Sequence, residues 1–537
     1  MCQRTNGGLP LKLNSQIGLS AQRSELRDFS GAARLYARFR LARLNGLDPI
    51  AVQERLLLRL LHRARFTRFG EHYGFSQIPD VSGFQARVPI RRYSDFLNEW
   101  WQKGYPDLTD VTWPGRIPFF AMTSGTTTGR SKFVPYTTDM RRAAARGGMD
   151  LLCFHLMNRL SSRLFGGLAL ALTGPSELEP RLEGVNAGAV SAIALGALPV
   201  AFRNRLLPPP EVANLPDWQE KIERLVDLSV DRDVRILGGS PNWLLIFLEA
   251  LARRFPDRSA RLSSWFPNLE LIMHGGVNFE PYRDRFRKLL VGSHAETREM
   301  YSASEGVFAI ADRGDNEGMR LHLDGGVFFE FVPVDTLPSE TPVRHWVANA
   351  ETGQDYALVV STSAGLWAYL VGDVVRLVDR QPPRLIVVGR VENGLSVFGE
   401  HLIEAEIAQA IAKATASFGL SVLDYCVGAI TAETGGHHLY LLETIERPSA
   451  EVRTKISERI DAHLCALNED YSELRRRNLA LDAPEVRFAQ PGGFVRWMEL
   501  RRKLGGQNKV PRIITDEPLF KDILATVPVA DDGEAGP

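Results

Sequence analysis

The sequence has few cysteines and no excess of charge of either sign. Its four cysteines among 537 residues stand far apart and form no Cys-x-x-Cys pair; they are Cys2, Cys153, Cys426 and Cys465. This pattern indicates neither a zinc site nor a disulfide framework, and it favours reduced thiols. Lys plus Arg and Asp plus Glu both total 64, so the overall charge indicates no nucleic-acid partner and no acidic membrane surface.

The sequence also lacks a long hydrophobic run and a signal peptide. The longest apolar runs, at residues 168–172 and 189–202, are shorter than the roughly 20 residues that a membrane-spanning helix needs. Residues 1–6 open a polar segment without the apolar core of a signal peptide. We therefore expect a cytoplasmic protein without a membrane partner.

What the sequence does contain is a run of hydroxyl groups and glycines closed by a lysine, at residues 122–135. It reads Met-Thr-Ser-Gly-Thr-Thr-Thr-Gly-Arg-Ser-Lys-Phe-Val-Pro and follows an apolar segment. Glycines let a backbone approach a phosphate closely, hydroxyl groups donate hydrogen bonds to it, and a lysine adds positive charge. The run predicts a nucleotide-phosphate loop, with a polar surface turn as the alternative.

This run matches neither of the two commonest nucleotide-binding motifs. A Walker A loop ends in Gly-Lys-Ser/Thr, whereas Gly129 is followed by Arg130, Ser131 and Lys132. The Gly-x-Gly-x-x-Gly spacing of dinucleotide-binding folds is not found in the run either. A phosphate loop at this position therefore indicates a different nucleotide-binding fold.

The hydrophobic pattern predicts an α/β fold. Helical spacing occurs in residues 50–65, 140–160 and 242–254, and buried strands are predicted at 234–237 and 269–273. Both strands end in glycines and precede a helix, which is the βαβ pattern of a parallel sheet. Ligands of such sheets bind at the carboxyl ends of the strands, where these glycines stand.

The length and pattern predict more than one domain. Residues 327–376 are rich in β-structure and predict a meander or small barrel packed against the α/β body. The predicted fold class is α/β, with sheets flanked by helices and a β-rich subdomain in a large N-terminal domain, and a smaller C-terminal α/β domain. We expect a loose leader at 1–30, the large domain at 31–390, the small domain at 391–525 and a disordered tail at 526–537.

Four segments, in this order, resemble motifs of the adenylate-forming superfamily, which contains acyl-CoA synthetases, peptide-synthetase adenylation domains and firefly luciferase. They are the loop at 123–132, Tyr-Ser-Ala-Ser-Glu at 301–305, Tyr-Leu-Val-Gly-Asp at 369–373, and a hinge with Gly-Arg-Val-Glu at 389–392 and Gly-Glu-His-Leu-Ile-Glu at 399–404. The resemblance implies the adenylate-forming fold, in which the small domain is mobile and rotates between two reaction steps.

Further segments narrow the resemblance to the auxin-responsive family of acyl acid amido synthetases, and we identify the chain as a bacterial member. They are residues 53–61, 84–90, 123–127 and 505–512, the last reading Gly-Gly-Gln-Asn-Lys-Val-Pro-Arg. The resemblance covers about residues 45–525. It implies an ATP-dependent, AMP-forming ligase that adenylates a carboxylic acid, releases pyrophosphate and forms a carbon–nitrogen bond by passing the acyl group to an amine, an amino acid in this family.

The resemblance also implies roles for individual residues at the nucleotide. The ATP phosphates are assigned to Thr123, Ser124, Gly125, Thr126, Thr127 and Lys132. Glu305 is assigned to Mg²⁺, which takes carboxylate together with phosphate oxygens, and a surface glutamate is the alternative. Adenine and ribose are assigned to Gly275, Gly276, Tyr301, Ser302, Asp373 and Arg390. In this set Tyr301 would stack on adenine and Asp373 would hold the ribose hydroxyls, with a core tyrosine and a turn aspartate as the alternatives.

Catalysis is assigned to Lys509 and His401. A C-terminal lysine reaches the α-phosphate and the attacking carboxylate in the superfamily, and a solvated surface lysine is the alternative reading of Lys509. The hinge departs from the superfamily pattern at Ser396, where a lysine is common, and at His401, where bacterial relatives often carry lysine. His401 is a candidate donor in the second step, with a charge that depends on pH near neutrality.

The acyl pocket is assigned to Phe120, Trp243 and His274. Apolar segments such as those around Phe120 and Trp243 are more often plain core, and His274 is either a contact of the substrate carboxylate or amine or a core histidine. We expect small-molecule partners, a carboxylic acid and an amine, and a monomeric chain. Two other functions stay open: an acyl-CoA synthetase with the same adenylation step, and a degenerate nucleotide-binding sensor or scaffold.

Overall fold

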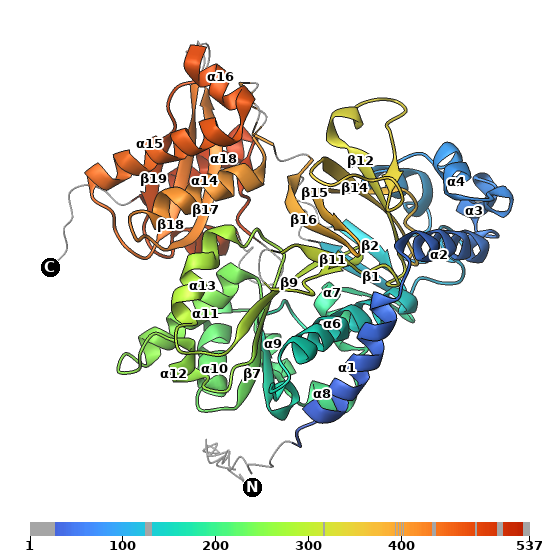
Figure 1. Ribbon diagram of the computed structural model, residues 1–537, viewed down its shortest axis with the longest axis horizontal. Coiled ribbons are helices and arrows are strands. Elements are labelled where there is room, and N and C mark those ends of the chain that lie inside the picture. The colour runs from blue at the N-terminus through green and yellow to red at the C-terminus, as the bar shows by residue number, and fades with distance from the viewer. Residues whose placement is uncertain are drawn as a thin grey trace, which may run out of the picture.

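The computed structural model describes residues 27–123, 132–314, 317–391, 394–395, 397–398, 400, 402–431, 436–477, 481–501 and 509–529. These residues form three β-sheets with helices packed against them. A large N-terminal part contains two of the sheets, and a smaller C-terminal part, orange to red in Figure 1, contains the third. The architecture is therefore mixed α/β, as the sequence predicts.

The largest sheet has twelve strands. In spatial order they are β13 (His345–Trp346), β12 (Val327–Pro333), β14 (Asp355–Thr362), β15 (Tyr369–Arg380), β16 (Pro383–Arg390), β11 (Met319–Leu321), β10 (Gly306–Ile310), β9 (Glu296–Ala303), β8 (Leu271–His274), β7 (Val234–Gly239), β3 (Leu168–Ala171) and β6 (Leu206–Leu207). From β13 to β9 neighbouring strands pair antiparallel, and from β9 to β6 they pair parallel. The β-rich segment is thus an antiparallel meander, and it continues the parallel sheet edge to edge instead of packing against it as a separate body.

The join at β9 explains this continuation. β9 is parallel to β8 on one side and pairs antiparallel with β10 on the other. Without β10, the backbone N–H and C=O groups along one side of β9 would form an unpaired sheet edge. The short strand β10 supplies these hydrogen bonds, and β11 pairs with β10 and β16 and so connects the two halves.

The parallel half confirms the predicted βαβ pattern. Strand β7 leads into α11 (Pro241–Arg254), β8 follows, and α13 (Arg283–Leu289) precedes β9. Helix α11 begins where the sequence indicates, because Pro241 occupies its first turn and its fixed φ suits that position. The apolar residues of α11 are buried against the sheet, among them Leu244, Phe247 and Leu248.

The remaining helices of the N-terminal part cover the sheets or connect their strands. They are α1 (Ser30–Asn45), α2 (Pro49–Ala64), α3 (Arg68–His72), α4 (Val81–Arg87), α5 (Tyr93–Phe96), α6 (Thr138–Asn158), α7 (Val190–Leu195), α8 (Val200–Arg203), α9 (Pro210–Ala213), α10 (Trp218–Ser229) and α12 (Leu262–Trp265). In α2 the Asp48 carboxylate accepts from the backbone N–H of Ile50, as expected of an N-cap before a proline. Helices α1 and α6 pack side by side (Figure 1).

The second sheet holds the hairpin on which the predicted phosphate loop stands. Its strands, in spatial order, are β2 (Lys132–Tyr136), β1 (Phe119–Thr123), β5 (Val185–Gly188) and β4 (Glu179–Leu182). The last described pair of the hairpin joins Thr123 to Lys132. Of the predicted phosphate-binding residues, Ser124, Gly125, Thr126 and Thr127 lie outside the described residues.

The C-terminal part has its own sheet and its own hydrophobic core. Its strands, in spatial order, are β19 (Glu485–Ala489), β18 (Gly436–Thr444), β17 (Val422–Thr431) and β20 (Ile513–Ile514), and its helices are α14 (Glu404–Ala416), α15 (Ala450–Leu467), α16 (Glu469–Arg477), α17 (Gly493–Leu500) and α18 (Glu517–Thr526). Ile407, Tyr440 and Ile460 are buried in a cluster that includes no residue of the N-terminal part. The domain boundaries drawn at 30, 390 and 525 stay predictions.

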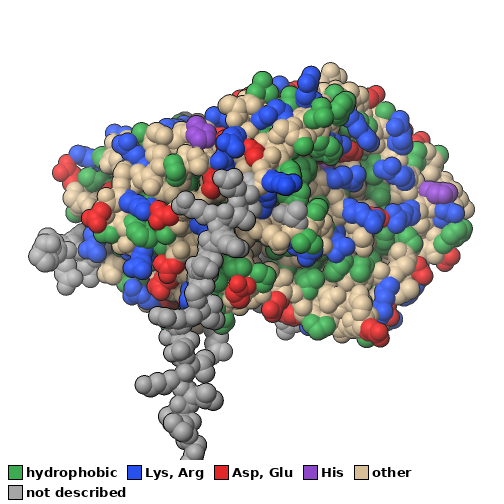
Figure 2. Space-filling view, turned by 90° about the horizontal axis from the view of Figure 1, so that it is seen from below, with side chains coloured by type: hydrophobic (Ala, Val, Ile, Leu, Met, Phe, Trp, Pro, Cys, Tyr) green, Lys and Arg blue, Asp and Glu red, His purple; other side chains and the backbone are tan. Residues whose placement is uncertain are grey.

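Two surface properties bear on the predicted partners. No helix among the described residues is both long and apolar enough to cross a membrane. Lys and Arg side chains are spread over the face seen in Figure 2 and are not gathered into one stripe.

Candidate active site

The candidate site lies where the two halves of the large sheet approach the C-terminal part. The carboxyl end of β8 supplies His274, and the two glycines Gly275 and Gly276 follow it. Strand β9 supplies Tyr301, while Asp373 and Arg390 face each other across β15 and β16. The site therefore forms at the carboxyl end of a parallel strand, as the βαβ pattern predicts.

Tyr301, Asp373 and Arg390 form one connected group. The Tyr301 hydroxyl donates to Asp373 Oδ2 at 2.6 Å, and Arg390 Nε lies 3.0 Å from Asp373 Oδ1. Burial raises the pKa of the Tyr301 phenol well above its ordinary value, and the Asp373 charge raises it further. The neutral phenol and the guanidinium together hold the carboxylate in one orientation. The Tyr301 ring itself contacts Phe308 edge-on, with centroids 5.1 Å apart.

Glu305 lies in the turn between β9 and β10 and is buried. Burial raises the pKa of its carboxyl, and a hydrogen bond from Tyr369 lowers it. The charge of Asp373 also raises this pKa, and the charge of Lys132 lowers it. A buried carboxylate with a raised pKa is stabilised by a nearby cation. The surroundings of Glu305 therefore fit a carboxylate ligand of a divalent ion.

Lys132 opens strand β2 beside this carboxylate. Its ammonium lies 5.5 Å from the ring centroid of Tyr93 and lowers the pKa of Glu305 through its charge. Thr123 stands opposite Lys132 in the hairpin. These two residues of the predicted phosphate loop are thus brought to the site, one at each end of the loop.

Lys509 reaches the same site from the C-terminal part. Its Nζ donates to the backbone carbonyl oxygen of Gly276, which is 233 positions away in the chain. Burial lowers the pKa of Lys509 to about 8, with Arg390 acting in the same direction and Glu404 and Asp373 opposing. The lysine therefore lies within the electrostatic reach of the carboxylates that face the site.

The two glycines allow this close approach. A Cβ at Gly275 would lie 2.3 Å from the backbone oxygen of Met300, and one at Gly276 would lie 2.6 Å from Lys509 Nζ. Gly276 also has a φ of +82°, which residues with a side chain rarely adopt. Both positions therefore require glycine.

Two charged residues at the site were not predicted. Arg512 is buried, and its Nη2 donates to the Tyr282 hydroxyl at 2.5 Å while its Nη1 donates to the Tyr425 carbonyl at 2.9 Å. Glu404, the first residue of α14, has a carboxyl pKa raised by burial and lowered by the charges of Arg512, Arg390 and Lys509. Both residues stand in segments that carry the family resemblance, at 505–512 and 399–404, so the motifs contained the signal.

His274 is a buried neutral imidazole beside Gly275. Its side chain is 3% exposed, and its ring stacks on Phe279 with centroids 3.9 Å apart. Burial lowers its pKa to about 3, and the charge of Arg283 acts in the same direction. Neither ring nitrogen has a hydrogen-bond partner within the described part of the chain.

The other predicted residues are not all brought together. Phe120 and Trp243 are buried in two different hydrophobic clusters, and Trp243 packs on Trp218 with ring centroids 4.2 Å apart. Ser302 is exposed and alternates in direction with Tyr301 along β9. His401, like Ser396, lies outside the described residues. The acyl-pocket and second-step assignments therefore stay predictions.

Three family models match the chain, one after another. They are the GH3 family N-terminal domain over residues 45–222, the GH3 family central domain over 320–390 and the GH3 family C-terminal domain over 405–518. The chain belongs to the GH3 family of acyl acid amido synthetases. This finding confirms the family that the sequence motifs indicate.

Two relatives in the GH3 family share less than a quarter of their residues with this chain over most of its length. Indole-3-acetic acid-amido synthetase GH3.3 of Arabidopsis thaliana is 22% identical over 88% of this chain and 90% of its own. Probable indole-3-acetic acid-amido synthetase GH3.2 of Oryza sativa subsp. japonica is 24% identical over 88% of this chain and 89% of its own.

Two solved structures resemble this GH3 protein in fold. The GH3.15 acyl acid amido synthetase has a TM-score of 0.76 at 18% identity, covering 92% of this chain and 97% of its own. The 2-hydroxyisobutyryl-CoA ligase in its postadenylation state has a TM-score of 0.56 at 17% identity, covering 93% and 91%. The likeness confirms the adenylate-forming fold with its large N-terminal and smaller C-terminal parts.

Proposed function

We propose that this GH3 protein is an ATP-dependent, AMP-forming acyl acid amido synthetase, which adenylates a carboxylic acid and passes the acyl group to the amine of an amino acid. The observation that carries the proposal is the contact of Lys509 with Gly276, beside Asp373 and Glu404. It brings a cation of the C-terminal part to Asp373 of the N-terminal sheet and to Glu404 at the start of α14. The curated relatives are named amido synthetases, which supports an amide product and therefore an amine as the acceptor.

In the first step, a carboxylate oxygen of the acid attacks the α-phosphorus of ATP, and the bond to pyrophosphate breaks. Both reactants are anions, so the barrier is lowered by positioning them and by neutralising charge. We assign the Lys509 ammonium to the α-phosphate and the attacking carboxylate. Lys132 and the loop residues Thr123, Ser124, Gly125, Thr126 and Thr127 are assigned to the departing phosphates, because amide, hydroxyl and ammonium donors suit phosphate oxygens.

The nucleoside is assigned to the group around Asp373. This carboxylate is already oriented by Tyr301 and Arg390, so its remaining lone pairs are fixed in direction for two ribose hydroxyls. Gly275 and Gly276 carry no side chain that would keep a flat base from the backbone. Tyr301, and Ser302 at the exposed face of β9, complete the proposed adenine and ribose contacts.

Glu305 is the residue that would hold Mg²⁺. Its buried carboxyl has a raised pKa, and a divalent ion beside it would offset the cost of burying the charged form. When bound, the ion neutralises phosphate charge. The hydrogen bond from Tyr369 keeps the Glu305 carboxylate oriented toward the same region.

In the second step, the amine nitrogen attacks the acyl carbonyl carbon, the bond to the phosphate oxygen breaks, and AMP leaves. The amine loses one proton to a base or to water. His274 is neutral at pH 7 because burial lowers its pKa to about 3, and its ring nitrogens have no partner in the described residues. We assign it a hydrogen bond to the acyl or amine group, and His401 stays a second candidate donor.

A product assay tests this function. The purified protein is incubated with ATP, Mg²⁺ and each acid of a panel of carboxylic acids. Each reaction is run with mixed amino acids, with coenzyme A, or with neither acceptor, and AMP and acyl products are measured. We expect acid-dependent AMP release and an amide product with amino acids. A thioester in place of an amide would identify an acyl-CoA synthetase, and nucleotide binding without AMP from any acid would identify a sensor or scaffold; either result overturns the proposal.

A further inference from the structure

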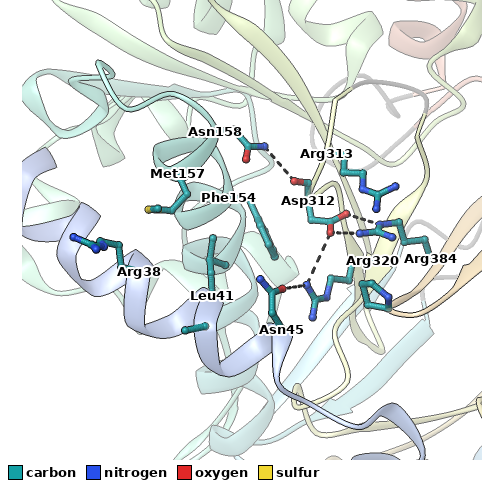
Figure 3. A pocket seen from close by; sticks show the side chains of 12 residues that line it. Arg38, Leu41, Asn45, Phe154, Met157, Asn158, Asp312, Arg313, Arg320 and Arg384 are labelled. Carbon is teal, nitrogen blue, oxygen red and sulfur yellow. Dashed lines mark hydrogen bonds and ion pairs between the residues drawn. The ribbon is translucent and has the colours of Figure 1, made fainter.

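A cavity, shown in Figure 3, lies at the opposite end of β16 from the candidate active site. Its volume is about 610 Å³, and residues of α1, α6, β11 and β16 line it. Arg384 lines the cavity and Arg390 belongs to the candidate site, and both stand on β16. Their separation along the strand is roughly 20 Å, at about 3.3 Å per residue. The cavity is therefore separate from the site proposed for adenylation.

The charged residues that line this cavity are mostly arginines. They are Arg38, Arg313, Arg320 and Arg384, with Asp312 as the acidic member of the lining. Arg320 is 7% exposed and Arg384 is 3% exposed. Buried arginines are costly unless their charges are matched, so the pairing of each one matters.

Arg384 has matched partners. Its Nε and Nη2 donate to the two oxygens of Asp312 at 2.9 and 2.7 Å, and its Nη1 donates to Asp379 at 2.7 Å. This is the bidentate geometry of a strong guanidinium–carboxylate pair. Asp312 is therefore already committed to Arg384.

Arg320 has no carboxylate of its own among the described residues. It donates to two neutral acceptors, Asn45 Oδ1 at 2.7 Å and the Leu44 carbonyl at 2.6 Å. Its Nη1 lies 4.0 Å from the Asp312 carboxylate that Arg384 already holds. Burial lowers the pKa of Arg320, the charges of Arg384 and Arg40 act in the same direction, and the charges of Asp312 and Asp150 oppose it. Arg320 is thus a buried guanidinium that has no close carboxylate partner among the described residues.

Arg313 stands at the rim of the cavity. Its side chain is half exposed, and its acidic neighbour Glu317 is itself exposed and lies 4.0 Å away. Figure 3 shows Arg313 on the same side of the cavity as Arg320 and Arg384. Three guanidinium groups therefore gather at one end.

The rest of the lining includes several apolar side chains beside Asn45 and Asn158. Leu41, Phe154 and Met157 separate the three gathered arginines from Arg38 (Figure 3). The Phe154 ring lies 5.9 Å from the Arg320 guanidinium carbon, so an apolar surface begins directly beside the gathered arginines. The cavity thus has a cluster of guanidinium groups at one end and apolar side chains between that cluster and Arg38.

We propose that this cavity is a second binding site, for a small amphipathic organic anion. Its carboxylate or phosphate group would pair with Arg313 and Arg320, and its apolar body would lie over Leu41, Phe154 and Met157. Guanidinium groups bind carboxylate and phosphate oxygens in pairs and match their planar geometry. A neutral molecule of the same shape would form no charge-assisted hydrogen bonds to these guanidinium groups, so the site favours the anion.

Calorimetric titration of the full-length protein, without ATP, tests the proposal with three eight-carbon probes. Octanoate and octyl phosphate carry the two kinds of anionic group on the same chain, and octanol is their neutral match. We expect at least one anion to bind at least about tenfold more tightly than octanol, because charge-assisted hydrogen bonds are lost with the neutral group. The stronger of the two anions identifies the head group. Equal binding of octanol, or no binding of either anion, would overturn the proposal.

Variants locate the binding. Arg313→Ala should lower the affinity for the anion about tenfold, and Arg313→Glu should lower it further, because the charge is reversed. Arg43→Ala, an exposed arginine of α1 outside the cavity lining, should bind like the unmodified protein. All three should keep the melting temperature and the AMP-forming activity. If both Arg313 variants bind the anion as tightly as the unmodified protein, the anion binds at another place, such as the adenylation site. That result would refute the assignment.

Discussion

The two ends of strand β16 carry similar ion pairs in opposite surroundings. At one end Arg390 contacts Asp373, and at the other end Arg384 contacts Asp312. Salt bridges of this kind are common in folded proteins and are weak evidence for function or stability by themselves. The groups around each pair, not the pair itself, distinguish the two ends.

The residues that gather at the two ends differ. Around Asp373 lie two further carboxylates, Glu305 and Glu404, whose pKa values burial raises, and the cation Lys509, whose pKa burial lowers. Around Asp312 the cavity brings together Arg313 and Arg320, and burial lowers the pKa of Arg320. The end proposed for ATP and Mg²⁺ thus mixes carboxylates with cations, whereas the end proposed for an organic anion is lined mainly by guanidinium groups.

The largest effect should come from removing the Lys509 ammonium, which the C-terminal part brings to the Arg390 end of β16. Lys509→Ala should lower acid-dependent pyrophosphate exchange about 10²- to 10³-fold, as expected for loss of one preorganised donor to a developing charge. Lys521→Ala is the control, since this exposed lysine of α18 pairs with Glu517. Exchange near the normal rate in Lys509→Ala would remove this residue from the proposed site.

Two aspartates of β15 compare the ends of that strand directly. Asp373→Ala should raise the KM for ATP about tenfold or more, because a charged hydrogen-bond acceptor for the nucleoside is lost. Asp379→Ala, at the Arg384 end, should leave the KM unchanged, because Arg384 keeps its pair with Asp312. Initial-rate kinetics at varied ATP measure both. An equal change in the KM for ATP in the two variants would show that the two ends do not differ as proposed.

The charge of Lys509 makes the first end sensitive to pH. Burial lowers its pKa from 10.5 to about 8, so the ammonium is present below pH 8 and is lost as the pH rises through that value. If the ammonium is required, kcat/KM for the exchange reaction should fall about tenfold for each pH unit above 8. Lys509→Arg carries a guanidinium that stays protonated. This variant should have lower activity, and its kcat/KM should not fall above pH 8. A wild-type kcat/KM that does not change between pH 7 and pH 10 would contradict a role for the protonated Lys509.

The smallest effect should come from the link between the two parts of the chain. Tyr282→Phe removes the hydroxyl that accepts from Arg512, three residues after Lys509. We expect about a fivefold lower rate of pyrophosphate exchange, since one hydrogen bond to a charged donor is lost. Tyr356→Phe, a buried tyrosine whose hydroxyl bonds within the N-terminal part, is the control. An effect on melting temperature without one on exchange would make the Tyr282 hydroxyl purely structural.

Local signals were enough to predict many of the helices and strands. Asp48 and Pro49 mark the start of α2, and the glycines that end β7 and follow β8 mark strand ends, because capping and turn preferences act over a few neighbouring residues. Strands β4 and β20 carry no such signal. β4 is exposed along its whole length and β20 has two residues, so neither shows an alternating apolar pattern.

The sequence alone determined the family and the residue types of the candidate site. Its ordered motifs name Tyr301, Glu305, Asp373 and Lys509, because the chemistry of phosphate, ribose and metal binding restricts which side chains can serve. The tertiary structure decided how these residues meet. Lys509 contacts Gly276 across 233 positions, and the Tyr301 hydroxyl bonds Asp373 across 72.

The arginine cluster of the cavity was likewise visible only in the fold. Arg320 meets Asn45 across 275 positions, and the carboxylate of Asp312 lies closer to Arg384 than to Arg320. No local pattern encodes such an arrangement, because it depends on burial and on which distant side chains share one partner. Composition reports equal totals of charge for the whole chain, whereas packing decides where charges of one sign gather.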